Sequence, residues 1–237
     1  MKANDRSTVS AMVPRMTQTV SARMVFSGDA VKCLRGGREI FSDLDFNVAS
    51  GELLTLTGPN GSGKTSLLRL MAGIGFPHAG KISWNGQNIL NEPQNHSARI
   101  RYVGHQDAVK PILTVNENLS FWYQYWKVHD QKRTIEETLD VFDLTKLADV
   151  PGRLLSAGQR KKVSLARLVL GSAPIWLLDE PTSSLDDKST KTLFDVVANH
   201  VAGNGLVVIA THQTLPLLGN SEVNLGTYAS VTGTVFL

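Results

Sequence analysis

The chain has 237 residues, of which 42% are hydrophobic and 19% are charged, and its formal net charge at pH 7 is +3. These values are typical of one large globular domain, or of a core with a subdomain, and they argue against disorder, a coiled coil or a fibrous repeat. No run of lysine and arginine is long enough for a nucleic-acid-binding stripe, so no nucleic-acid partner is expected. Cys33 is the only cysteine, which excludes an intrachain disulfide and a cysteine-cluster metal site.

Residues 1–24 differ in composition from the rest of the chain. They hold one acidic residue, Asp5, and four basic ones: Lys2, Arg6, Arg15 and Arg23. This composition resembles an organellar presequence, but a disordered tail or a start codon assigned too early is the simpler interpretation. We expect a flexible tail over residues 1–24 and a domain over residues 25–237.

The first predicted elements of the domain are strands. A half-exposed strand is predicted where three apolar residues alternate with polar ones, namely Leu44, Phe46 and Val48, and Gly51 marks a turn into a second strand at residues 52–57. A glycine-rich loop at residues 58–65 follows, and then a helix. The Asn-Gly pair in "KISWNGQNI" predicts a tight hairpin, and therefore an antiparallel piece.

From Thr114 the pattern becomes helical. "TVNE" is a capping box that starts at Thr114, and "TIEE" repeats the device at Thr134, so residues 107–160 are predicted to form a mainly helical insert. After the insert, helices alternate with continuous apolar strands: helix 159–171, strand 175–180, helix 190–201 and strand 206–212. This order predicts an α/β fold whose mostly parallel sheet is covered on both faces.

The loop "GPNGSGKT" matches the phosphate-loop pattern G-x-x-x-x-G-K-[ST] in full, between a strand and a helix as that motif requires. The alternative is a glycine-rich turn with a solvated lysine, but such a turn would match the complete pattern only by chance. Backbone N–H groups would surround the β-phosphate, Lys64 would neutralise the β- and γ-phosphate oxygens, and the Thr65 hydroxyl would bind Mg²⁺. The predicted nucleotide-binding residues are Gly58, Pro59, Asn60, Gly61, Ser62, Gly63, Lys64, Thr65 and Ser66.

Polar side chains follow three of the predicted strands. In an open parallel sheet the carboxyl ends of the strands surround the ligand, so Asp179 and Glu180 would lie where a phosphate loop on a neighbouring strand presents its nucleotide. Asp179 would hold Mg²⁺ through water, and Glu180 would polarise the attacking water. His212 could contact the γ-phosphate and order Glu180, while Gln106 could sense Mg²⁺ and the water. Taken singly, these residues would be a helix cap or surface side chains, but the phosphate loop favours the catalytic interpretation.

A second turn, "LSAGQ" at residues 155–159, also looks suited to contact phosphate. These motifs, in this order, resemble the ATP-binding cassette (ABC) family from about Val25 to His212. Residues 58–65 are similar to its Walker A motif, Gln106 to the Q-loop glutamine, and residues 155–159 to the signature. Asp179 with Glu180 resembles the Walker B pair, "SSLD" with Asp186 the D-loop, and His212 the H-loop histidine.

The resemblance implies an ATPase with a P-loop NTPase core, an N-terminal antiparallel β piece and a helical subdomain. It also implies a head-to-tail dimer of two copies, in which the signature of one chain contacts the ATP held by its partner through Ser156, Ala157, Gly158 and Gln159. Ala157 replaces the more usual glycine. Leu34 and Arg35 stand where cassettes commonly have an aromatic residue for adenine, although an arginine plane can also stack on a base.

Within the family, "YVGHQDAVKPILTVNENLSFW", "LSAGQRKKVSLARL" and "THQ" resemble the ATP-binding subunits of the cytochrome c maturation system, the haem-exporter type. This implies integral membrane subunits of the CcmB, CcmC and CcmD type and, indirectly, a haem chaperone of the CcmE type. It also implies a peripheral position at the cytoplasmic face of the inner membrane, or at the mitochondrial inner membrane if residues 1–24 are a presequence. Hydrolysis would drive haem export or release of the haem-loaded chaperone.

Two other function classes remain open from the sequence. The ATPase subunit of another small-solute or lipid transporter is the main alternative. A cassette protein acting on DNA or ribosomes would usually carry a long coiled-coil insert or a second cassette, and the sequence shows neither pattern.

The aromatic run in residues 120–126 has two interpretations. Helical spacing places four side chains on one buried face, Leu119, Trp122, Tyr123 and Trp126. Phe121 and Tyr125 lie on another face, where they either extend the core or form an exposed apolar socket for a membrane subunit.

Overall fold

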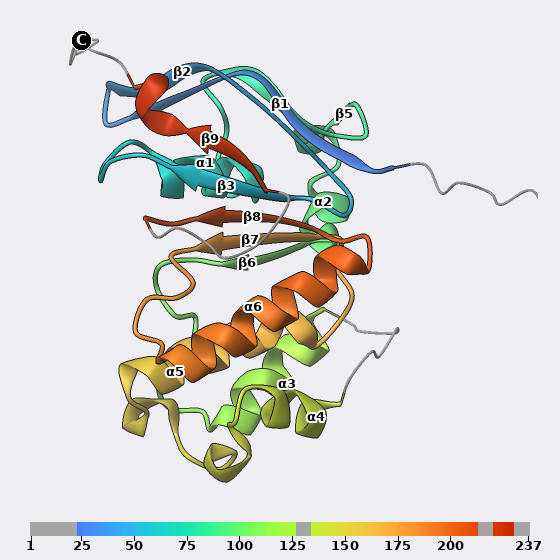
Figure 1. Cartoon of the computed structure of the whole chain (residues 1–237), viewed down its shortest axis with the longest axis vertical. Coiled ribbons are helices and arrows are strands. Elements are labelled where there is room, and N and C mark those ends of the chain that lie inside the picture. The colour runs from blue at the N-terminus through green and yellow to red at the C-terminus, as the bar shows by residue number, and fades with distance from the viewer. Residues whose placement is uncertain (1–22, 127–133, 213–219, 230–237) are drawn as a thin grey trace, which may run out of the picture.

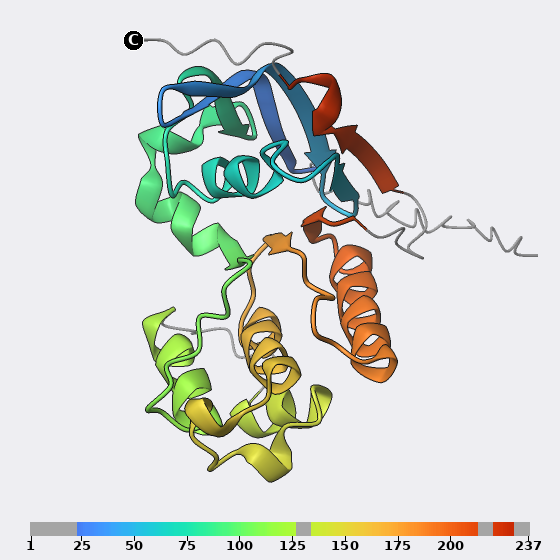
Figure 2. The same ribbon diagram turned by 90° about the vertical axis from the view of Figure 1, so that its left-hand side faces the viewer.

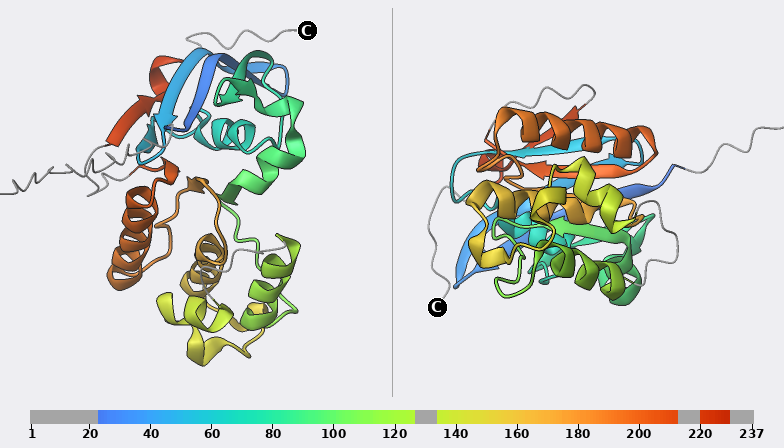
Figure 3. Two further views of the ribbon diagram at one scale, coloured as in Figure 1. Left: turned by 90° about the vertical axis from the view of Figure 1, so that its right-hand side faces the viewer. Right: turned by 90° about the horizontal axis from the view of Figure 1, so that it is seen from below.

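The computed structural model describes residues 23–126, 134–212 and 220–229. Figure 1 shows two β-sheets in the upper part of the molecule and a group of helices in the lower part. Figure 2 and Figure 3 show the helical lobe joined to the sheet part by the segment that follows β6 and the segment that precedes β7. The predicted α/β fold with an antiparallel piece and helices is confirmed.

The N-terminal sheet is antiparallel, with the strand order β2-β1-β4-β5. Its strands are β1 (Val25–Arg35), β2 (Arg38–Ala49), β4 (Ala79–Trp84) and β5 (Gln87–Asn88). The predicted hairpin is present, because Trp84 pairs with Gln87 across a turn in which Asn85 and Gly86 have φ values of 50° and 79°. Leu44, Phe46 and Val48 are buried along β2, as their alternation predicts, whereas β1 was not predicted.

The second sheet is parallel, with the strand order β6-β7-β8-β3-β9. Its strands are β3 (Leu53–Thr57), β6 (Ile100–Val103), β7 (Ile175–Asp179), β8 (Leu206–Ala210) and β9 (Asn220–Asn224). The expectation that the phosphate loop and the acidic pair follow neighbouring strands is wrong, since β8 lies between β3 and β7. A strand after His212, β9, was also not predicted, because its "NSEVN" sequence has little apolar periodicity.

The two faces of the parallel sheet contribute to two hydrophobic cores. On one face, α1 (Lys64–Met71) packs between the parallel and antiparallel sheets through Leu67, Leu68 and Met71. On the other face, α5 (Ala157–Ala166) and α6 (Asp187–Ala202) cover Trp176, Leu178, Val207 and Ile209. Side chains alternate between the two faces of a strand, so every buried strand serves both cores.

The helical lobe contains α3 (Val115–Tyr125), α4 (Ile135–Val141) and the 3-10 segments Thr145–Leu147 and Gly152–Leu154. Both predicted capping boxes are confirmed, because the Thr114 and Thr134 hydroxyls accept from the N–H groups of Glu117 and Glu137. The predicted buried stripe of α3 also packs into the core, with Leu119 fully buried. Remaining short elements are α2 (Pro93–Arg99) and the 3-10 segments Ile89–Asn91, Arg167–Val169 and Leu225–Thr227.

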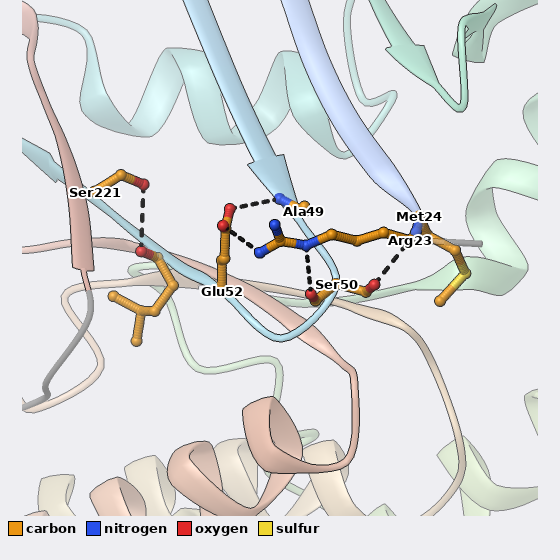
Figure 4. A network of polar contacts seen from close by, with 7 residues as sticks. Arg23, Met24, Ala49, Ser50, Glu52 and Ser221 are labelled. Carbon is orange, nitrogen blue, oxygen red and sulfur yellow. Dashed lines mark hydrogen bonds and ion pairs between the residues drawn. The ribbon is translucent and has the colours of Figure 1, made fainter. Parts of the chain in front are cut away.

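The described chain begins in a polar network at the turn between β2 and β3, shown in Figure 4. The Arg23 guanidinium pairs with Glu52, and its Nε also lies 3.4 Å from the Ser50 carbonyl oxygen. The Met24 N–H donates to the Ser50 hydroxyl at 3.2 Å. Residues 23 and 24 of the expected tail are therefore anchored, while residues 1–22 lie outside the described residues. No helix in the described ranges is long and apolar enough to cross a membrane.

Candidate functional site

The carboxyl ends of four parallel strands meet at one edge of the sheet. The strand register aligns Leu56 of β3 with Ala210 of β8, and Ala210 with Asp179 of β7. Val103 at the end of β6 pairs with Leu178, one residue before Asp179. The phosphate loop, the acidic pair, His212 and the segment with Gln106 consequently all leave the sheet at this edge.

The phosphate loop depends on glycine at particular backbone positions. Gly58, Gly61 and Gly63 have φ values of 127°, 83° and 102°, in the region that side-chain-bearing residues rarely adopt. A Cβ atom on Gly63 would lie 2.6 Å from Cγ2 of Ile40, so β2 packs directly against the loop. A Cβ on Gly61 would meet nothing within 4 Å, which leaves this part of the loop backbone open to a ligand.

Lys64 lies across the loop. Its side chain is buried, and its Nζ donates to the carbonyl oxygens of Gly58 at 2.8 Å and Pro59 at 3.2 Å. Burial lowers the pKa of Lys64, while the negative charges of Glu180 and Asp179 oppose that shift. The lysine and both carboxylates therefore belong to one electrostatic site.

Thr65 and Ser66 are half-buried in the first turn of α1, which begins with Lys64 directly after the Gly63 cap. The remaining loop residues differ in exposure, because Pro59 and Asn60 are exposed while Ser62 is buried. Since the first N–H groups of an α-helix have no partners within the helix, this end of α1 is suited to an anion.

The acidic pair lies at the end of β7, at the same edge of the sheet as the phosphate loop. Asp179 is 2% exposed, and its Oδ2 atom has no hydrogen-bond partner within the described parts of the chain. The negative charge of Asp179, after burial, helps to raise the pKa of Tyr102 on β6 to about 12. Asp179 therefore lies near β6, the strand that leads toward Gln106, whose side chain is exposed three residues after β6 ends.

Glu180 adopts an unusual backbone conformation. Its φ value is 46°, although its N–H still donates to the Ala210 carbonyl oxygen at 2.9 Å. A non-glycine residue in this region costs conformational energy, and such strain is concentrated at functional sites. Its Oε1 lies 3.3 Å from Nε2 of His212, so the predicted acid and histidine are brought together.

The signature residues start α5 in the helical lobe, as Figure 2 shows. The Ser156 hydroxyl accepts from the Gln159 N–H at 3.2 Å, and the Gln159 side chain accepts from the Ser156 N–H at 2.8 Å. This is a third capping box, missed in the sequence although Ser-x-x-Gln is its known signal. Ser156 and Ala157 are exposed, whereas Gly158 and Gln159 are half-buried.

The D-loop lies beside the signature. Asp186 begins α6, where its Oδ1 accepts from the Ser189 N–H at 2.7 Å. Hydrogen bonds from Ser189 lower the pKa of Asp186. This carboxylate is thus fixed as a helix cap, exposed to solvent next to the signature turn.

The end of β1 lies beside the start of α1. The Cys33 thiol is buried, which raises its pKa, while the charge of Arg35 and a hydrogen bond with Ser66 oppose that shift. Of the two residues considered for adenine, Arg35 is exposed and Leu34 is half-buried. They follow Cys33 in β1, one and two residues beyond its contact with Ser66.

Comparison with known proteins gives concordant results. The profile of the ABC transporter family matches residues 41–183. The cytochrome c biogenesis ATP-binding export protein CcmA of Paramagnetospirillum magneticum is 46% identical over 86% of this chain and 95% of its own length. The protein of the same name from Rhodospirillum rubrum is 45% identical over 88% of both chains.

A solved structure supports the fold independently. The putative ABC transporter ATP-binding protein from Pyrococcus furiosus superposes with a TM-score of 0.74, covering 87% of this chain and 100% of its own, at 22% identity. The family profile spans more than half of the chain, and the relatives align over most of it. This chain therefore belongs to the ABC transporter family and is an ABC-type ATPase.

Proposed function

We propose that this chain is the ATP-hydrolysing subunit of a membrane ABC complex for cytochrome c biogenesis. The observation that carries this proposal is the identity of 46% and 45% to two proteins named for ATP-binding export in that process, over nearly their whole length. In this role the chain couples ATP binding and hydrolysis to haem export or to release of a haem-loaded chaperone.

ATP binds at the phosphate loop. The backbone N–H groups from Gly61 to Ser66 surround the β-phosphate, and the exposed Pro59 and Asn60 border the phosphate chain. Lys64 moves from the loop carbonyls to the β- and γ-phosphate oxygens. That exchange replaces neutral acceptors by charged ones, which strengthens its hydrogen bonds.

Mg²⁺ fits the residues of the site. Asp179 presents a buried carboxylate oxygen without a hydrogen-bond partner among the described residues, as expected for a group that completes its contacts through a cation and its water. Thr65 and Gln106 would supply further oxygen ligands. When bound with ATP, Mg²⁺ would supply positive charge that offsets the negative charge of the phosphate chain.

Glu180 is the group that accepts the proton of the attacking water. The carboxylate stands at the strand end beside Asp179, and its neighbour His212 orders it and contacts the γ-phosphate. Gln106 approaches from the β6 side of the same edge. These side chains hold the water in line with the phosphate, which is the main requirement of phosphoryl transfer.

A second copy of the chain completes each site. Ser156, Ala157 and Gly158 are at the start of α5, where free N–H groups favour an anion. In a head-to-tail dimer these residues and Gln159 close on the γ-phosphate bound to the partner's phosphate loop. Asp186 lies beside them and faces the same junction.

The membrane subunits dock on the helical lobe. Phe121 and Tyr125 are 38% and 63% exposed on α3, with their rings stacked at 6.2 Å, and Ile112 is 79% exposed on the segment that follows Gln106. Exposed apolar groups of this kind suit a helix from an integral membrane subunit of the CcmB, CcmC or CcmD type. The chain is accordingly peripheral, at the cytoplasmic face of the inner membrane, and a CcmE-type haem chaperone acts on the far side of the complex.

The decisive experiment is purification of the tagged full chain from detergent-solubilised membranes. We expect integral membrane subunits and haem-binding proteins to co-purify in near-stoichiometric amounts, and the Phe121→Ser/Tyr125→Ser variant to lose them. Recovery of a solute-binding protein, a lipid transporter or ribosomes instead would overturn the assignment to cytochrome c biogenesis while leaving the ATPase intact.

A further inference from the structure

Lys161 is a buried cation that none of the motifs accounts for. It lies in the second turn of α5, its side chain is 2% exposed, and its Nζ has no hydrogen-bond partner among the described residues. Its ion-pair partner is the carboxylate of Asp107, whose Oδ1 lies 4.0 Å from Nζ. Asp107 directly follows Gln106, so a residue of the signature helix faces the Q-loop of the same chain.

A second buried cation shares this carboxylate. Arg167 is 5% exposed, and burial lowers its pKa to about 10, a shift that the charge of Asp107 opposes. Its guanidinium donates to the Ser164 carbonyl oxygen at 2.9 Å and lies 3.5 Å from the carbonyl oxygen of Tyr102 on β6. Asp107 thus interacts with two cations that come from one helical segment.

The ion pair between Lys161 and Asp107 balances a buried positive charge. A buried lysine without an opposite charge is strongly unfavourable, so Lys161 favours the arrangement in which Asp107 stays close. Consecutive Cα atoms are about 3.8 Å apart, so a fixed Asp107 also restricts the place of Gln106. Burial lowers the pKa of Lys161, and the negative charges of Asp107, Asp179 and Glu180 oppose that shift, so the cation shares the electrostatic environment of the acidic pair.

We propose that Lys161 is a positioning residue, which holds Asp107 and thereby places Gln106 of the same chain at its own nucleotide. The role rests on the proposed function, in which Gln106 acts on Mg²⁺ and water while the signature turn of α5 contacts the partner's ATP. In the head-to-tail dimer, Lys161 would therefore link the helix whose signature turn contacts one nucleotide to the Gln106 that serves the other.

The test compares Lys161→Met, which keeps length and apolar volume but removes the charge, with Lys161→Arg, which keeps the charge. Lys162→Met is the matched control, because Lys162 is the next residue, is only half-buried and lines a different polar pocket with Asp143 and Lys188. Each purified full chain is assayed for its melting temperature, its Kd for trinitrophenyl-ATP, and kcat and KM for MgATP.

We expect Lys161→Met to lower kcat by about tenfold, a typical coupling for contacting residues, without a comparable change in Kd or melting temperature. Lys161→Arg should keep most of the activity, and Lys162→Met should behave as wild type. Asp107→Asn should reproduce the defect, and the double variant with Lys161→Met should be no worse than either single one.

Three results would overturn this role. They are a normal kcat in both Lys161→Met and Asp107→Asn, losses that multiply in the double variant, or, in Lys161→Met, a fall in kcat matched by equal losses in nucleotide affinity and stability. If Lys161→Met does not fold, Asp107→Asn with its half-buried side chain decides the question alone. A wild-type chain that fails to hydrolyse MgATP would instead overturn the proposed site roles as a whole.

Discussion

The signature turn lies directly against the D-loop, since a Cβ atom built on Gly158 would be 2.6 Å from the carbonyl oxygen of Ser184. Ser184 itself has a φ value of 67°, so this backbone is already constrained. The contact is between two segments proposed to face the partner's nucleotide. A methyl group at position 158 must therefore displace the D-loop backbone.

We expect Gly158→Ala to reduce ATP hydrolysis strongly while nucleotide binding by the isolated chain persists. The helix gains about 1 kcal/mol from alanine, and overpacking costs about 1–3 kcal/mol, so the free energy of unfolding should fall by at most about 2 kcal/mol. Ala157→Gly is the matched control on the exposed neighbouring residue and should stay near wild type. Full activity in Gly158→Ala, measured by phosphate release, would contradict a tight signature–D-loop contact.

Glu180→Gln tests the proposed general base. Glutamine preserves the shape and hydrogen bonding beside His212 but cannot take a proton, so hydrolysis should drop by about a hundredfold or more. ATP binding should survive, and an ATP-held dimer should accumulate in size-exclusion chromatography. Lys64→Ala should fail earlier, at nucleotide binding. Near-normal turnover by Glu180→Gln would assign the base to another group.

Ser156→Arg tests whether the site is shared between two chains. A bulky cation at the signature should block ATP-dependent dimerisation and turnover, while the monomer still binds nucleotide. Ser156→Ala separates out the lost helix cap, which costs about 1 kcal/mol.

Mixing Ser156→Arg with Lys64→Ala gives the sharper measurement. A head-to-tail dimer of the two has one site with both defects and one with neither, so some phosphate release should return. A site built within one chain predicts no recovery at any mixing ratio.

Phe121→Ser with Tyr125→Ser tests the docking surface on α3. Both side chains are exposed in the structure, and the Lys110 ammonium lies 4.3 Å from the Phe121 ring centroid. Loss of the ring stacking and of this cation contact should lower the free energy of unfolding by only about 1–2 kcal/mol. Basal ATPase should persist while co-purification of membrane subunits and cytochrome c assembly are lost.

Leu119→Ser is the control for that variant, on the fully buried face of the same helix. It should destabilise the chain by several kcal/mol, about 2–5 for a buried leucine truncated to a small side chain. A thermal loss of that size in the double variant would place its rings in the core and remove the docking surface.

His96 predicts a pH dependence of stability. Its ring is 2% exposed, its Nε2 donates to the Met71 carbonyl oxygen at 2.8 Å, and its Nδ1 is buried without a hydrogen-bond partner in the described ranges. Burial lowers the pKa of His96 below its ordinary value of 6.5. The unfolded chain thus binds this proton more readily than the folded chain.

The sign of the effect follows from that difference. The contribution of the buried, neutral His96 ring to the free energy of unfolding is fully present above pH 6.5. It is lost as the pH falls through the lower pKa of the folded state. Thermal melts of wild type and His96→Gln from pH 7.5 to 5 should therefore differ in slope, with the variant less sensitive to acid. If the two melting temperatures fell in parallel, titratable groups other than His96 would account for the loss of stability at acidic pH.

The sequence alone determined the features that depend on residues close together in the chain. The glycine loop before Lys64, the capping boxes at Thr114 and Thr134, and the Asn85-Gly86 turn each need only a few adjacent residues with particular φ values or hydrogen-bonding groups. Apolar runs identified β7 and β8 for the same reason, because a strand buried on both faces is apolar throughout.

Other features were decided only by the tertiary structure. The position of β8 between β3 and β7, and the pairing of β9 with β3, result from strand partners far apart in the chain. The left-handed backbone of Glu180 and the approach of Gly158 to Ser184 are equally invisible in local patterns. The spacing of apolar residues predicts which face of a helix or strand is apolar, but not which distant element packs against that face.

The contact of Lys161 with Asp107 shows most clearly what cannot be predicted from the sequence alone. In the sequence, Lys161 belongs to a basic run of Arg160, Lys161 and Lys162 that suggests a solvated surface. Helical geometry turns successive residues by about 100°, so one of the three faces the core while its neighbours do not. The local pattern does not say which of the three is buried or which carboxylate balances its charge. Both depend on the packing of α5 against α3, α4 and the loop that follows β6, which exists only in the folded chain.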